Sequence, residues 1–136
     1  MGLALHVGTD SHEIGSPSFL KAFFSCVLVL IESEDWGSRF PVVMNDLYSG
    51  HLDAARATEA RDELRKVKEE LSTYSPSYVV WDFENRNLRP PWGDEISESI
   101  TSMADYFVTS DGKDFIEVLD EALADSSALN VPVTIS

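Results

Sequence analysis

The sequence predicts an α+β fold, with a single domain over residues 1–136 in which a small mixed sheet packs against three helices. Three observations lead to this prediction. Helical and extended patterns follow one another irregularly along the chain, unlike the regular alternation of a doubly wound sheet. One helical pattern, at residues 17–33, is apolar on nearly every side and is therefore expected to be buried. Another, at residues 53–72, combines one apolar stripe with an exposed charged face.

The N-terminal part is expected to begin with a strand at residues 3–7, followed by the buried helix. Ser16 supplies an N-cap for this helix, and Pro17 occupies the first helical position, where a missing N–H is tolerated. We expect the helix to run to about residue 33 as the central packing element of the core. Its large apolar residues are Phe19, Leu20, Phe23, Phe24, Val27, Leu28, Leu30 and Ile31.

Two further helices are predicted in the middle of the chain. Pro41 restarts a short helical segment at 42–48, and Gly50 is placed to stop it. The longer helix at 53–72 carries charges that alternate in sign at four-residue spacing, which keeps its outer face soluble. Its apolar stripe consists of Ala57, Ala60, Leu64, Val67 and Leu71.

The C-terminal half is expected to contain shorter elements. The β-branched and aromatic content of residues 78–83 predicts a strand. Ser110 or Asp111 is expected to cap the last helix, and Pro132 is compatible with a strand only at a sheet edge. In chain order after residue 83, we expect a loop at 84–95, a short helix at 96–102, a short strand at 106–109, a helix at about 112–125 and an edge strand at 131–135.

The chain is strongly acidic. It has 24 acidic and 10 basic residues, which gives a formal net charge of −14. Residues 53–70 are nearly neutral, whereas residues 94–125 hold ten acids and a single base, Lys113. Such a charge repels nucleic acid and anionic membranes and attracts basic protein surfaces. We therefore expect a basic protein partner, with no nucleic acid and no membrane.

A cytoplasmic location is expected. The N-terminus shows no secretory signal, because charged residues interrupt any apolar stretch there. The apolar run at 19–31 is shorter than the roughly 20 residues needed to span a bilayer. Cys26 is the only cysteine and lies within this run, so we expect a buried, inert thiol in a reducing compartment.

Motifs of nucleotide binding, zinc binding and nucleophilic catalysis are absent from the sequence, and no cofactor is expected. The nearest constellation to a catalytic site is acidic. Asp82 and Glu84 would share one face of the strand predicted at 78–83, and Asp94 follows nearby. Divalent cations favour carboxylates in such a geometry, so a metal-dependent hydrolase using these three residues is one hypothesis. Exposed carboxylates at a strand end are the simpler interpretation.

Two clusters in expected loops contain tryptophan beside glycine: Trp36 in the segment 36–41, and Trp92 in the segment 90–93. Tryptophan and arginine are enriched at the energetic centres of protein interfaces, so Trp36, Arg39 and Trp92 are candidates for partner binding. The alternative is that both tryptophans close the edges of the core, with their indole N–H groups bonded to loop carbonyls.

Two sets of motifs together resemble one family. The first set runs from Ser18-Phe19 to Phe24 and continues with Trp36-Gly37-Ser38-Arg39-Phe40-Pro41, Met44, Leu47-Tyr48 and Gly50. The second comprises Val79-Val80-Trp81-Asp82, Pro90-Pro91-Trp92-Gly93 and Tyr106-Phe107-Val108-Thr109-Ser110-Asp111-Gly112. In these motifs, from about residue 15 to 125, the chain resembles the bacterial immunity protein 70 family.

The resemblance implies a small cytoplasmic antidote of a polymorphic toxin system, which binds and occludes a cognate toxin domain without catalysis of its own. The acidic surface would then speed association with a basic toxin. If the toxin attacks nucleic acid, the carboxylates of 94–125 are expected to take the place of phosphates in its cleft. The expected interface residues are Trp36, Arg39, Tyr48, Asp82, Glu84, Trp92 and Asp94. An acidic module for another basic partner is a third hypothesis.

Overall fold

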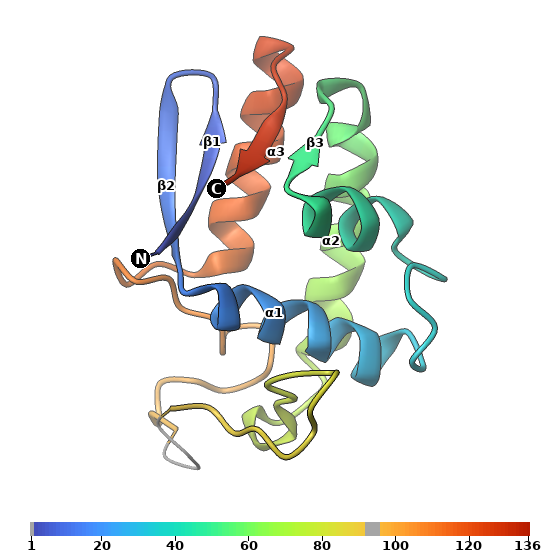
Figure 1. The fold of residues 1–136 in the computed structure, drawn as a ribbon, viewed down its shortest axis with the longest axis vertical. Coiled ribbons are helices and arrows are strands. Elements are labelled where there is room, and N and C mark those ends of the chain that lie inside the picture. Colours follow the sequence, from blue (N-terminus) through green and yellow to red (C-terminus); the bar gives the residue numbers. More distant parts are fainter. Residues whose placement is uncertain (1, 92–95) are drawn as a thin grey trace.

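The computed structural model describes residues 2–91 and 96–136, which form an α+β fold. Two long helices, α2 (Ala57–Leu71) and α3 (Phe115–Leu129), lie side by side, and α1 (Pro17–Cys26) runs across their lower ends (Figure 1). A small sheet packs against α3. No helix in the described ranges combines the length and apolar character needed to cross a membrane.

The sheet contains β1 (Leu3–Val7), β2 (Asp10–Gly15), β3 (His51–Leu52) and β4 (Val133–Ile135), in the spatial order β2-β1-β4-β3. Each pairing of strands is antiparallel, whereas a mixed sheet is predicted above. The strand expected at 3–7 is confirmed. The C-terminal strand also forms, but its predicted edge position is wrong, because β4 lies between β1 and β3. Strands β2 and β3 are additional to the predicted elements.

The N-terminal helix begins where the sequence predicts. The Ser16 hydroxyl accepts a hydrogen bond from the Phe19 N–H at 3.1 Å, which satisfies one of the free donors of the first turn. After Cys26 the chain continues as a π-helical segment, η1 (Val27–Ile31), so the helical conformation ends close to the expected residue 33. Its expected burial is confirmed, since Phe23, Phe24 and Val27 are almost inaccessible to solvent.

The two middle helices are also confirmed. The short one is η2 (Val42–Leu47), and Gly50 follows it with a φ of 91°, a conformation that glycine adopts readily. A 3₁₀ turn, η3 (Ala54–Arg56), leads into α2. The five apolar residues of the predicted stripe are all buried. This stripe packs against η1, η2 and α3.

The last helix, α3, begins a few residues later than expected. Asp114 caps it, since its carboxylate accepts a hydrogen bond from the Ile116 N–H at 3.0 Å, so neither Ser110 nor Asp111 is the cap. Asn130 ends the helix in the left-handed conformation, with a φ of 56°. Asparagine tolerates this conformation better than most residues do.

The core is built around four phenylalanine rings. Phe23 of α1 makes edge-to-face contacts with Phe107 and Phe115, with ring centroids 5.4 Å and 5.1 Å apart. Phe19 contacts the same two rings, in each case with centroids 5.8 Å apart. Edge-to-face pairs contribute beyond the burial of their area. The aromatic rings therefore tie α1 to the start of α3 and to the segment before it.

The strand predicted at 78–83 is wrong. Tyr78 ends a 3₁₀ turn, η4 (Pro76–Tyr78), and the following residues have no regular structure. Their backbone groups bond to side chains of α1 instead of to a neighbouring strand. The Val80 N–H donates to the Cys26 sulfur at 3.3 Å, and the Phe83 N–H donates to the Ser25 hydroxyl at 2.9 Å.

Two shorter elements also differ from expectation. The helix predicted at 96–102 is replaced by turns, and the strand at 106–109 is reduced to a single bridge between Val108 and Asp114. Residues 84–91 form the expected irregular loop, and the rest of that loop, 92–95, lies outside the described residues. The fold in this region is held by contacts between distant residues, which local patterns do not report.

The environment of Cys26 gives a direct test of the packing of α1. Burial raises the pKa of the thiol to about 12, despite the opposing hydrogen bond to Val80. Because the thiolate is the reactive form, Cys26 is expected to react with DTNB in the native protein only as fast as the protein opens, and completely in denaturant. Rapid reaction of the folded protein, followed by absorbance, would contradict this packing.

Candidate functional site

The loop between η1 and η2, residues 32–41, carries Trp36 and Arg39 and has an unusual backbone. Ser33 and Glu34 have φ angles of 52° and 63°, and Gly37 has a φ of 72°. Consecutive left-handed residues other than glycine are costly and persist only where their surroundings enforce them. At Gly37 a Cβ atom would lie 3.0 Å from the Asn45 amide nitrogen, so the packing as well as the φ angle favours glycine.

A buried carboxylate enforces this loop. The Glu32 residue is 2% exposed, and its carboxylate accepts three backbone hydrogen bonds. One oxygen accepts from the Gly37 N–H at 3.1 Å, and the other from the Arg39 and Phe40 N–H groups at 3.1 and 3.0 Å. Hydrogen bonds to a charged acceptor are among the stronger ones in proteins. Sequence reasoning missed Glu32, although an acid directly after a long apolar run is the signal that marks it.

Two acids of α2 hold the end of this loop and the start of η2. The Glu63 carboxylate accepts from the Val43 and Val42 N–H groups at 2.9 and 3.3 Å. Burial raises the pKa of Glu63, and the two backbone hydrogen bonds oppose that shift. Glu70 accepts two hydrogen bonds from the Arg39 guanidinium, both at 2.5 Å. Arg39 is therefore directed toward α2.

Trp36 belongs to a partly exposed aromatic cluster. Its ring centroid lies 4.9 Å from that of Tyr48 and 5.3 Å from that of Phe83. Phe24 of α1 supports the cluster from beneath, 5.1 Å from the Tyr48 ring. The indole N–H donates to the Asn45 side-chain oxygen at 3.0 Å. We call Trp36, Tyr48 and Phe83 the aromatic face; Tyr48 is its most accessible member, at 44% exposure.

Ion pairs flank the aromatic face. The Lys21 ammonium lies 2.6 Å from the Glu84 carboxylate and 3.3 Å from that of Asp82. It also lies 5.3 Å from the centroid of the Phe83 ring. A further ion pair joins Arg86 to Glu34. Asp82 and Glu84 thus point toward the same cation, although the segment is a turn and not the predicted strand.

The predicted site residues are distributed as follows. Trp36 contacts Tyr48 and Phe83, while Asp82 and Glu84, on either side of Phe83 in sequence, meet at Lys21. Arg39 lies on the same loop as Trp36 but pairs with Glu70 of α2. Trp92 and Asp94 lie outside the described residues. Phe83, Lys21 and Glu32 were not predicted, because their roles depend on contacts between distant parts of the chain.

The described part of the chain contains no group of three or more histidine, cysteine or acidic residues that could hold a metal ion. Asp82 and Glu84, proposed above as metal ligands, both bond to Lys21. A cation already occupies the position between these carboxylates. The metal-dependent hydrolase therefore gains no support from the described geometry.

A separate groove, with a volume of about 380 Å³, runs between α2 and α3. Its floor contains the buried side chains of Leu64 and Ile116. The Arg61 guanidinium reaches across it and bonds to the Asp120 carboxylate at 3.0 and 3.2 Å. None of the five predicted site residues that the structure describes lines this groove.

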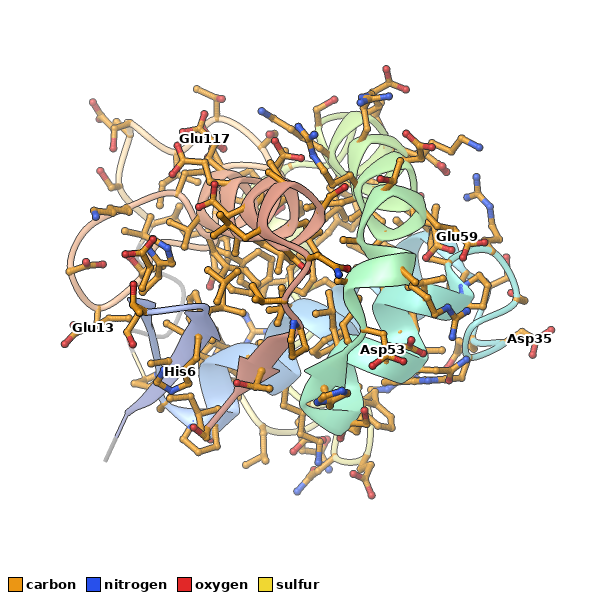
Figure 2. All side chains as sticks on the ribbon, turned by 90° about the horizontal axis from the view of Figure 1, so that it is seen from above. His6, Glu13, Asp35, Asp53, Glu59 and Glu117 are labelled. Atoms are coloured by element: carbon orange, nitrogen blue, oxygen red, sulfur yellow. The ribbon has the colours of Figure 1, made fainter. Side chains whose placement is uncertain are left out.

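Many basic side chains are paired within the molecule. Besides those named above, the structure shows the pairs Arg56–Asp46, Arg65–Asp62 and Lys113–Asp111. Acidic side chains consequently dominate the outer surface. Figure 2 shows Glu13, Asp35, Glu59 and Glu117 projecting outward around the molecule, from different elements. Exposed acids therefore come from several elements and are not confined to residues 94–125.

The ion pair of Asp82 predicts a pH dependence. Partial burial raises the pKa of Asp82, but hydrogen bonds from the Glu84 N–H and from Lys21 outweigh it and hold the pKa below the usual 3.8. A carboxyl with a depressed pKa stabilises the fold above its unfolded pKa, and this contribution is lost as pH falls through the folded pKa. Asp82→Asn should therefore lower the free energy of unfolding at neutral pH, with a difference from wild type that shrinks in acid.

Urea unfolding of the variant and the wild type, carried out once at neutral pH and once at a pH below the pKa of Asp82, measures this difference in the free energy of unfolding. Asp35→Asn, which removes an exposed acid, is the matched control. An equal loss of stability at both pH values would show that the charge of Asp82 is not responsible.

Comparison with known families gives one result. Residues 5–135 match the model of the family described as Immunity protein 70, which covers nearly the whole chain. Comparisons with curated proteins and with solved structures give no match. The extent of the family match includes the loop 32–41, the aromatic face and the ion pairs beside it. The chain belongs to the immunity protein 70 family.

Proposed function

We propose that this protein neutralises a cognate toxin domain of a polymorphic toxin system by binding and occluding it in the cytoplasm, without catalysis of its own. Membership of an immunity protein family is the observation that carries the proposal. An inhibitor that acts by occlusion needs affinity and rapid association and requires no reactive group. The exposed aromatic side chains and the acidic surface are suited to those two needs.

The aromatic face is the proposed centre of the interface. Interfaces concentrate binding energy in a few aromatic and arginine residues that lose water on binding. Trp36 and Tyr48 are partly accessible, Phe24 packs against both from within the protein, and the partly buried Phe83 packs against Trp36. The proposed interface also includes the rest of the predicted set: Arg39, Asp82, Glu84, Trp92 and Asp94.

The charge of the protein is proposed to act on the rate of association. A net charge of −14 creates a field that attracts a basic toxin from any direction. Of the acids in 94–125, Asp105 and Asp114 accept hydrogen bonds within their own segments. Glu117 and Glu121 are exposed on α3 and are better placed to meet a basic partner. The toxin is thus proposed to be basic.

The proposal predicts tight binding to the toxin domain encoded beside this protein. Calorimetric titration should show a 1:1 complex of nanomolar or higher affinity that weakens as salt is raised, because exposed charges are screened. Absence of binding at micromolar concentrations would remove the proposed function.

A second prediction locates the interface. Trp36→Ala and Tyr48→Ala should each weaken toxin binding by about tenfold or more, because each removes a partly exposed aromatic anchor. Leu129→Ala is the matched control, since Leu129 is 59% exposed and is the last residue of α3, whose C-terminal end lies far from the loop 32–41 in Figure 1. Its affinity should stay within about twofold of wild type. Unchanged affinity in both aromatic variants would place the interface elsewhere, and an equal loss in Leu129→Ala would show that the effect is not specific to the aromatic face.

A further inference from the structure

The shape of the loop 32–41 is set from inside the protein. Trp36 lies between Ser33 and Glu34, which have left-handed backbones, and Gly37, whose N–H donates to Glu32. Left-handed conformations at residues other than glycine are rarely stable by themselves. The hydrogen bonds to Glu32 therefore act on the part of the loop that would otherwise relax and carry Trp36 with it.

The buried position of Glu32 is costly and requires a reason. A carboxylate in the interior loses its hydration and is retained only where hydrogen bonds or charges compensate. Here three backbone N–H groups of one loop compensate it, and the Arg39 guanidinium attracts it. An apolar residue at this position would leave those N–H groups without acceptors. The carboxylate thus stabilises one particular loop shape.

We propose that Glu32 is a positioning residue for toxin binding: it holds the loop 32–41 in its bound shape before the toxin arrives, so that Trp36 is presented ready to bind. This inference rests on the proposed function and deepens it. A loop that is already ordered loses little conformational entropy on binding, which raises affinity without any new contact. Glu32 itself is buried and is not part of the contact surface.

Glutamine cannot replace Glu32 in this role. The two oxygens of the carboxylate both accept, one from Gly37 and the other from Arg39 and Phe40. In Glu32→Gln one oxygen becomes an NH₂ group, which would face a backbone N–H, donor against donor. The side chain has nearly the same size, so the variant changes the hydrogen bonding while keeping the packing.

A double-mutant cycle tests the proposal. Toxin affinity is measured for the wild type, Glu32→Gln, Trp36→Ala and the double variant. If Glu32 acts through Trp36, Glu32→Gln should weaken binding about tenfold in the wild type but less than about twofold when Trp36 is already absent. Equal losses in the two backgrounds, or no loss in the wild type, would overturn the proposal.

Asp105→Asn is the matched control for the cycle. The Asp105 carboxylate also accepts backbone hydrogen bonds, from Thr101 at 3.2 Å and Ser102 at 2.8 Å, but in a different loop. Its removal should change affinity by less than about twofold in both backgrounds. If Asp105→Asn weakens binding as much as Glu32→Gln does, general destabilisation explains both and the proposal fails.

A spectroscopic readout separates this inference from the proposed function. The indole N–H of Trp36, identified by the NMR signal lost in Trp36→Ala, should exchange with water faster in Glu32→Gln than in the wild type, because the bond to Asn45 opens more often. An unchanged exchange rate of this N–H in Glu32→Gln would overturn the positioning role, whether or not the protein binds a toxin. Absence of toxin binding by the wild type, beside a changed signal, would overturn the proposed function and leave the loop mechanism intact.

Gly37→Ala covers the case in which Glu32→Gln does not fold. It disturbs the same loop through its φ of 72° and through the close approach to Asn45. It should likewise weaken binding in the wild type and have little effect without Trp36. If Gly37→Ala weakened toxin binding equally with and without Trp36, the proposal would be overturned.

Discussion

The packing of Phe23 is the constraint on which the rest of the structure depends. Its ring meets Phe24, Phe107 and Phe115 in edge-to-face contacts, with centroids 5.1–5.5 Å apart. Through these contacts α1 fixes the start of α3 and the irregular segment that precedes it. The neighbouring Phe24 carries the same packing outward to Trp36 and Tyr48. A continuous set of rings therefore joins the interior to the aromatic face, which makes that face part of the core and not an appendage of it.

The helices could be predicted because each buries apolar residues whose spacing is visible within a few turns of the chain. The stripe of α2 and the apolar circumference of α1 are visible in a few turns of chain, and Ser16 with Pro17 marks a start. The strand at 78–83 could not be judged in this way. Val79 and Trp81 are indeed buried, but the backbone groups around them bond to Ser25 and Cys26 of α1. The amino-acid composition of residues 78–83 thus predicted the burial of Val79 and Trp81 correctly and the secondary structure wrongly. Strand β2, in contrast, is polar and becomes a strand by pairing with β1.

The candidate site was likewise predictable only in part: its residue types could be recognised, but the contacts between distant residues could not. Residue type and expected position singled out Trp36, Tyr48, Asp82 and Glu84, because aromatic and charged residues in loops and at the ends of helices and strands are typical of recognition. Their common neighbours were not predictable. Lys21 is separated from Glu84 by 63 residues and Glu32 lies seven residues from Arg39, and only the fold shows that each pair meets. It also shows that the base beside Asp82 comes from α1, where a search of the adjacent sequence could not find it.

The position of β4 bears on how the chain folds during synthesis. β4 follows every other strand in sequence and yet fills the place between β1 and β3. Among the strands that the structure describes, β1 pairs only with β2 and β3 has no partner until residues 133–135 have left the ribosome. Pairings between residues so distant in sequence form slowly, because a long loop must close first. A nascent chain can thus bring Phe23, Phe107 and Phe115 together before β4 emerges, whereas the sheet remains open until residues 133–135 are available.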